Sequence, residues 1–178
     1  MLAWRLLRNR LSTKDNLVRR GIITSNNSLC VAARCDNTET AEHLFLHCDI
    51  STDLWNNVFN WLVISLVMPS FLRQHFMQFS KMAGWFRSSH LFFTTVWFAT
   101  VWVLCKERNY RIFQNTASTS VDLIEKVKLY SFVWLKSKEA SFCYSFTDWW
   151  KHPTLCMGVI FCFLCFWCRC LLSGTLTL

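Results

Sequence analysis

The sequence predicts a mainly α-helical fold. Apolar residues recur at helical spacing in several segments, most clearly within residues 51–63. The chain has only 4 Gly and 2 Pro in 178 residues, which leaves little material for the tight turns of an all-β protein. Its hydrophobic content of 53%, with 16 Phe and 10 Trp, is high for a soluble protein of this length. We therefore expect helices whose aromatic side chains form a core.

The first twenty residues predict two helices. Residues 2–11 place Trp4, Leu7 and Leu11 on one stripe, as in an amphipathic helix. Ser12 or Thr13 is the expected N-cap of a second helix, and Gly21 is its expected C-terminal stop.

A polar loop and two further helices are expected next. Residues 22–38 form the loop, and residues 39–47 form a short helix with Thr38 as N-cap. The helix over 51–63 has a repeating apolar face that we assign to the core rather than to base stacking. That face comprises Leu54, Trp55, Val58, Trp61 and Leu62.

Four soft metal ligands lie close together in this region, as Cys30-x4-Cys35 and His43-x4-Cys48. Closed structural zinc sites use four sulfur and nitrogen donors of this kind. The alternative is a set of unrelated buried thiols, because free Cys behaves as a small hydrophobe. His47 competes with Cys48 as the fourth ligand, since His43 and His47 would share one face of a straight helix. The spacing favours a zinc site and leaves its fourth ligand open.

Several motifs in the first third of the chain form a recognisable pattern: residues 4–17, Arg19-Arg20-Gly21, residues 39–48, Leu54-Trp55 and Trp61-Leu62. Together they resemble the zinc-binding domain that follows the reverse transcriptase in plant LINE-type (non-LTR) retrotransposons. The resemblance implies Cys30, Cys35, His43 and Cys48 as the zinc ligands, with a helix that ends near His47. It also implies an N-terminally truncated domain and hence a C-terminal fragment of a reverse transcriptase protein.

The rest of the chain predicts a hairpin-like helical extension. Met68-Pro69 breaks the pattern, and we expect domains at 1–65, 66–150 and 151–178. Residues 89–114 form a long helix whose apolar part, 91–105, spans about 22 Å against a hydrocarbon core of roughly 30 Å, so a buried helix is expected. Ser120 caps a helix to about residue 140, and the two helices form a hairpin over the zinc domain. The apolar face of the helix that begins at Ser120 comprises Val121, Ile124, Val127, Phe132 and Leu135.

Basic residues are concentrated near the N-terminus. Residues 1–35 carry seven Lys or Arg against Asp15 alone, while residues 36–64 carry five acidic residues and no Lys or Arg. A basic face beside a zinc domain suits weak, sequence-independent binding to RNA or DNA through counterion release. The alternative is a solvated helix surface. The expected nucleic-acid-binding residues are Arg5, Arg8, Lys14, Arg19 and Arg20.

Catalytic patterns are missing from the sequence. The acidic residues are scattered, whereas a polymerase needs clustered aspartates to hold two metal ions. The four glycines stand alone, so no phosphate loop is expected. We therefore expect no enzyme activity and no small-molecule substrate. The first segment has no apolar signal-peptide core, which predicts reduced cysteines and an intracellular protein, nuclear or cytoplasmic.

The C-terminal tail supports an alternative function. Residues 154–168 are almost uninterruptedly hydrophobic, and residues 155–172 would form a helix close to one bilayer crossing. The predicted function is a non-catalytic zinc-binding and nucleic-acid-binding remnant of a retrotransposon protein. The alternative is a small membrane-associated protein with a transmembrane segment at about 155–172.

Overall fold

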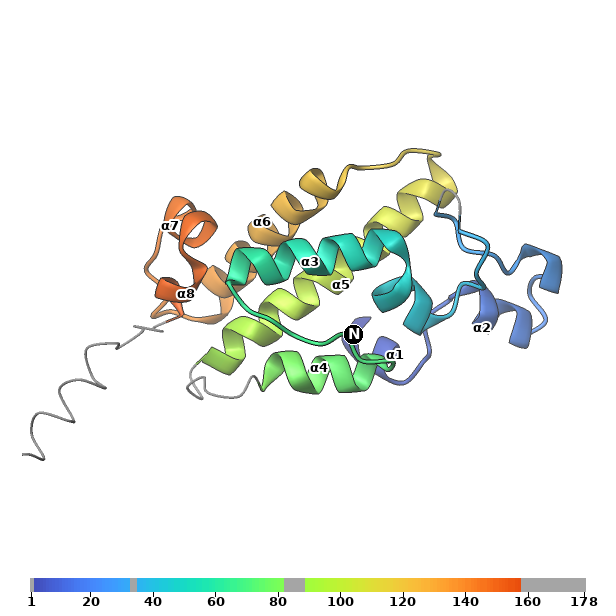
Figure 1. The fold of residues 1–178 in the computed structure, drawn as a ribbon, viewed down its shortest axis with the longest axis horizontal. Helices are drawn as coiled ribbons and strands as arrows, with labels where there is room; N and C mark the ends of the chain where they lie inside the picture. Colours follow the sequence, from blue (N-terminus) through green and yellow to red (C-terminus); the bar gives the residue numbers. More distant parts are fainter. Residues whose placement is uncertain (1, 33–34, 82–88, 158–178) are drawn as a thin grey trace, which may run out of the picture.

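The computed structural model describes residues 2–32, 35–81 and 89–157, and within these residues the fold is mainly helical, as predicted (Figure 1). Residues 2–48 are called the N-terminal lobe below. They contain a 3₁₀ turn, η1 (Ser25–Asn27), and a π-helical turn, η2 (His43–His47). The α-helices are α1 (Leu2–Leu7), α2 (Lys14–Arg19), α3 (Asp49–Leu62), α4 (Leu72–Ser80), α5 (His90–Phe113), α6 (Ser120–Lys138), α7 (Phe146–Lys151) and α8 (Pro153–Cys156).

Helix α5 is the centre of the structure. It packs against α6, α4, α3 and η2, and in Figure 1 it runs the length of the helical body. Trp97, Ala99 and Val101 are fully buried at its middle. The predicted long helix and the α5–α6 hairpin are both observed, and α6 also packs on α3.

Helix α3 buries most of the face that its sequence predicts. Leu54, Trp55, Val58 and Leu62 are fully buried, and Trp61 is half-buried. The Trp55 indole N–H donates to the carbonyl oxygen of Phe45 at 2.8 Å. The helix ends where Val63 adopts a left-handed conformation with φ of 53°.

Helix α4 was not predicted, and it carries a buried histidine. His75 is fully buried, and its Nδ1 accepts a hydrogen bond from the Trp97 indole N–H at 3.0 Å. The ring of Trp55 meets the His75 ring edge-on, with centroids 4.4 Å apart. Burial in this aromatic setting, with a smaller contribution from His47, lowers the pKa of His75 to about 4.

Two predicted helices differ from the sequence-based expectation in detail. α1 ends at Leu7 instead of residue 11, because Asn9 turns the chain with φ of 49°. Leu6 is buried, whereas Trp4 is 52% exposed. In α6 the N-cap is Thr119, one residue before the predicted Ser120, and Thr119 and Asp122 form a capping box.

The residues of α6 that face the core also differ in part from those predicted. Val121, expected on the apolar face, is 66% exposed, and Leu123 is buried instead. Ile124, Val127 and Leu135 are buried as predicted, and Phe132 is half-buried.

Helices α7 and α8 close the end of the hairpin. Ser145 caps α7, Trp149 is fully buried, and its indole N–H donates to Ser131 Oγ at 3.1 Å. Cys156 and Met157 are buried in the same core.

The predicted membrane segment therefore begins inside packed structure, and its remainder lies outside the described residues. None of the helices in the described part combines the length and the apolar character needed to cross a bilayer.

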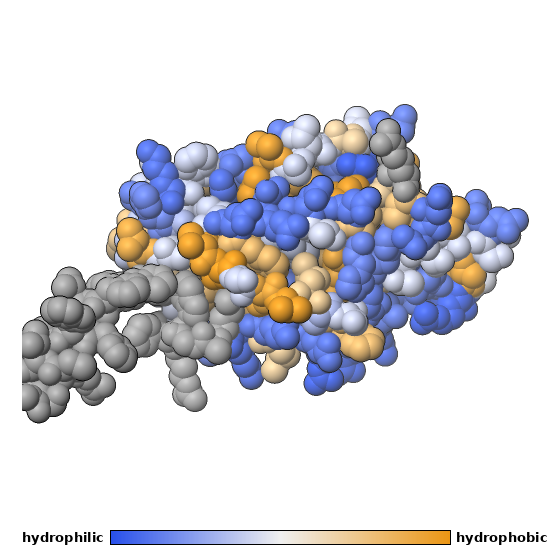
Figure 2. All heavy atoms as spheres, in the orientation of Figure 1, coloured by the Kyte–Doolittle hydropathy of each residue, from blue (hydrophilic) through white to orange (hydrophobic). Residues whose placement is uncertain are grey.

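One buried hydrophobic cluster joins side chains from both sides of the expected boundary at 65/66, and the division into domains stays a prediction. Figure 2 shows hydrophilic atoms along α3 and hydrophobic atoms gathered beside it, over the segment that leads to α4. Val63 and Val67 in this segment are 81% and 86% exposed.

Candidate metal centre

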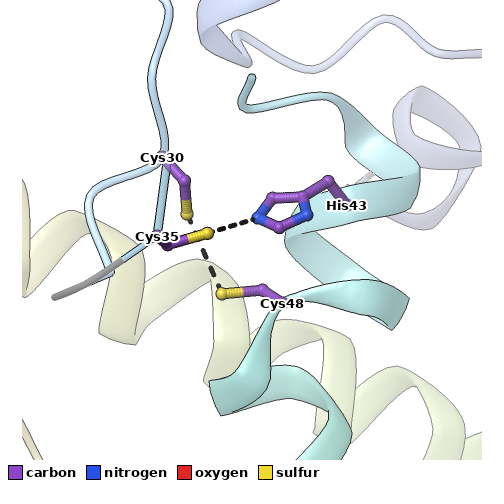
Figure 3. Close-up of side chains that lie close together, drawn as sticks. All are labelled: Cys30, Cys35, His43 and Cys48. Atoms are coloured by element: carbon purple, nitrogen blue, oxygen red, sulfur yellow. Dashed lines mark hydrogen bonds between the residues drawn. The ribbon is translucent and has the colours of Figure 1, made fainter. Parts of the chain in front are cut away.

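A paired loop presents the first two cysteines of the cluster. An isolated antiparallel β-bridge joins Leu29 to Thr38. The Cys30 amide donates to the carbonyl oxygen of Asn37 at 2.9 Å, and the Glu39 amide donates to that of Ser28 at 2.8 Å. These bonds close the loop at its base, so Cys30 and Cys35 lie on the same lobe facing η2 (Figure 3).

The helix that carries His43 begins later than predicted. Thr40 is its N-cap, because Thr40 Oγ1 accepts from the His43 amide at 3.0 Å and the Thr40 carbonyl oxygen accepts from the Leu44 amide at 2.9 Å. The predicted N-cap, Thr38, is instead held in the β-bridge.

A π-helical turn brings Cys48 toward His43. In an α-helix, residues five apart lie about 140° from each other, since each residue advances about 100°. Here the Cys48 amide donates to the His43 carbonyl oxygen at 2.8 Å, an i to i+5 bond that widens the turn and places Cys48 near His43. Cys48 itself is extended, with ψ of 143°, so its side chain points back to the loop (Figure 3).

The four donor atoms are spaced as one metal ion requires. Sγ of Cys30, Cys35 and Cys48 and a ring nitrogen of His43 all lie within 4.8 Å of one another. Cys30 Sγ is 3.8 Å from Cys48 Sγ, and Cys35 Sγ is 3.1 Å from His43 Nε2. In a tetrahedral site with Zn–S bonds near 2.3 Å, two sulfurs are about 3.8 Å apart. The donor set and the spacing therefore fit a zinc ion.

Two thiols of the cluster affect each other's pKa. The hydrogen bond between Cys30 and Cys48, aided by burial, raises the pKa of Cys30, and the same hydrogen bond lowers the pKa of Cys48. A metal ion binds thiolates, so its binding would displace protons from these thiols.

His47 lies away from the cluster. It is exposed, and its Nε2 is 3.2 Å from the carbonyl oxygen of Ser70, to which it is hydrogen-bonded. The structure therefore brings Cys48, and not His47, next to the other three side chains.

A buried ion pair that was not assigned from the sequence joins this lobe to α5. Glu39 is fully buried, and Arg108 Nη2 donates to its Oε1 at 2.7 Å and to the carbonyl oxygen of Ser12 at 3.2 Å. The Lys14 amide donates to the same Glu39 oxygen at 3.0 Å. Arg108 and Arg111 also line a small cavity beside Cys30 and Cys48. Each guanidinium group is already paired with a carboxylate, Arg108 with Glu39 and Arg111 with Glu107.

The expected nucleic-acid-binding residues have different surroundings. Arg5, Arg8 and Arg20 are exposed and have no carboxylate partner among the described residues. Arg19 pairs with Asp15 at 3.2 Å. Lys14 is half-buried, and its Nζ donates to the carbonyl oxygen of Leu29 at 2.7 Å, so it supports the loop that carries Cys30.

Comparison with known proteins agrees with this geometry. Residues 1–55 match the family described as zinc-binding in reverse transcriptase, and the match includes all four clustered residues. Neither the curated proteins nor the solved structures gave a match. The first third of the chain is therefore similar to the zinc-binding domain of reverse transcriptases.

Proposed function

We propose that this chain is a non-catalytic, zinc-stabilised, nucleic-acid-binding fragment of a plant non-LTR retrotransposon reverse transcriptase protein. The observation that supports it most directly is the meeting of three cysteines and one histidine inside the segment that matches the family. The weak, sequence-independent binding of RNA or DNA is expected inside the cell, in the nucleus or cytoplasm.

The zinc ion would have a structural role. Cys30, Cys35, His43 and Cys48 would supply all four ligands, which leaves no open position for a substrate or a reactive water. A closed site of this kind contributes its binding free energy to folding. It would tie the Cys30–Cys35 loop to η2 and thereby fix the start of α3.

Nucleic acid would bind to the arginines of the N-terminal lobe. Arg5, Arg8 and Arg20 are exposed and have no carboxylate partner in the described part of the chain, so their charge is available to phosphates. Arg8 and Arg10 also lie against the Trp4 ring, with their guanidinium carbons 5.2 and 5.3 Å from its centroid. Lys14 and Arg19 would contribute less, because each already has a partner in the protein.

The test is a charge reversal in the full chain. We expect Arg5→Glu, Arg8→Glu and Arg20→Glu together to weaken binding to oligonucleotides of unrelated sequence by the same factor. The slope of the logarithm of the binding constant against the logarithm of the salt concentration is expected to become less steep by about 2 to 3. A matched control reverses Lys81, which directly follows α4, and Lys136 and Lys138 of α6; all three are exposed. If the arginine variant binds as tightly as the parent chain, these arginines are only a solvated surface.

A further inference from the structure

A cavity of about 280 Å³ lies between α5 and α6, at the turn that joins them. This is near the lower end of the volumes typical of small-molecule sites, about 300 Å³. Val103 and Leu123 form apolar parts of its lining, and Tyr110 and Tyr130 add aromatic rings. Its hydrogen-bonding residues are Lys106, Gln114, Thr116, Ser118 and Lys126.

Two lysines give this cavity a positive charge. Lys126 Nζ donates to Ser118 Oγ at 2.9 Å, and Lys106 Nζ lies 5.4 Å from the centroid of the Trp102 ring. Within the described residues, neither ammonium group has a carboxylate at ion-pair distance. Each therefore keeps its charge available to a ligand.

Two carboxylates lie near these lysines. Glu107 lines the cavity, and its Oε1 accepts from Arg111 Nε at 2.7 Å and from the Ser118 amide at 2.9 Å, while its Oε2 is buried without a partner in the described structure. Asp122, one turn before Lys126, is held by Thr119 in the capping box of α6. The cavity also adjoins the start of this nineteen-residue helix, where the helix dipole favours negative charge.

We propose that this cavity binds the phosphate of a nucleotide, with Lys106 and Lys126 as its charge partners. The hydroxyls of Ser118, Tyr110 and Tyr130 are available for further hydrogen bonds, and the tyrosine rings with Val103 and Leu123 provide an apolar surface for a base. The nucleotide is either free or the phosphorylated end of a nucleic acid. The site is separate from the arginines of the N-terminal lobe and stands without them.

Calorimetry on the full, zinc-loaded chain tests the proposal. The probes are inorganic phosphate, AMP, and one oligothymidylate with and without a 5′-phosphate. Lys106→Gln with Lys126→Gln removes both charges and is expected to weaken binding at least about tenfold, because two charge-assisted hydrogen bonds are lost. Lys138→Gln, an exposed position at the end of α6, is the matched control and is expected to leave binding unchanged.

A second variant tests the cavity without changing its charge. Thr116 is exposed at the turn and lines the cavity, so Thr116→Trp would fill it while both lysines stay. Binding of AMP that is lost in both variants supports a free nucleotide. Binding confined to the 5′-phosphorylated oligonucleotide, with the same losses, supports a chain end. The proposal is overturned if no probe binds at millimolar concentration, if the double lysine variant binds as well as the parent, or if Thr116→Trp does.

Discussion

At the scale of single residues, two polar side chains in unusual surroundings carry testable consequences. His75 lies in an aromatic core with one nitrogen bonded to Trp97 and its Nε2 buried without a partner in the described structure. Cys48 owes its position beside His43 to a single widened turn. The surroundings of His75 could not be predicted from sequence, because they depend on packing between segments far apart in the chain. The family resemblance implied Cys48 as a ligand, but helical periodicity did not indicate the widened turn that places it beside His43.

His75 makes stability depend on pH. Its folded pKa of about 4 lies below the ordinary value of 6.5, so the unfolded chain binds more protons between these values and stability rises with pH. The contribution of neutral His75 to the free energy of unfolding is fully present above pH 6.5. As the pH falls toward 4, the free energy of unfolding decreases by about 3 kcal/mol in total on account of this residue. Urea unfolding of the parent chain and of His75→Leu at pH 7.5 and 4.5 measures this.

Protonation of the metal ligands affects both proteins equally, so the difference between them isolates His75. We expect the parent chain to lose more stability on acidification than His75→Leu. Equal losses would show that His75 has no such role.

Zinc binding discriminates the two candidates for the fourth ligand. Cys48→Ser removes a thiolate from the cluster and is expected to abolish stoichiometric zinc, whereas His47→Ala leaves zinc bound, since His47 bonds to Ser70 instead. Metal analysis of the two purified variants measures the outcome. Loss of zinc in His47→Ala with retention in Cys48→Ser would reverse the assignment.

At the scale of elements, periodicity predicted the long regular helices and local bonding decided the rest. The apolar face of α3 extends over several turns, and the first half of α5 is apolar on nearly every side, so their sequences alone indicated these helices. Helices α4, α7 and α8 are short and were missed. Thr38 resembles an N-cap in sequence, but the bridge to Leu29 occupies it, and Thr40 caps the helix.

The Glu39–Arg108 pair is expected to be the strongest polar link between the N-terminal lobe and α5. Arg108→Leu leaves the fully buried Glu39 carboxylate without its counter-charge and is expected to cost about 3 to 5 kcal/mol. Arg19→Leu breaks the exposed pair with Asp15 and is expected to cost at most about 1 kcal/mol. Urea unfolding of both variants compares them, and similar small costs would contradict a linking role for Arg108.

At the scale of the whole molecule, the N-terminal lobe and the long helices share one core. Phe45 from η2 and Trp55 from α3 are fully buried with Trp97 of α5. The four clustered side chains were singled out from their spacing and from family resemblance, but the buried ion pair between Glu39 and Arg108 was not. A carboxylate and a guanidinium 69 residues apart give no local pattern by which to recognise them.

The central claim is that the cluster of Cys30, Cys35, His43 and Cys48 holds one zinc ion. Native mass spectrometry of the full chain, freshly purified and never exposed to a chelator, tests it most directly. We expect one zinc ion per chain, and none in the Cys30→Ser and Cys48→Ser double variant, because two of the four donors are lost. A parent chain without zinc, or a double variant that still carries it, would contradict this account.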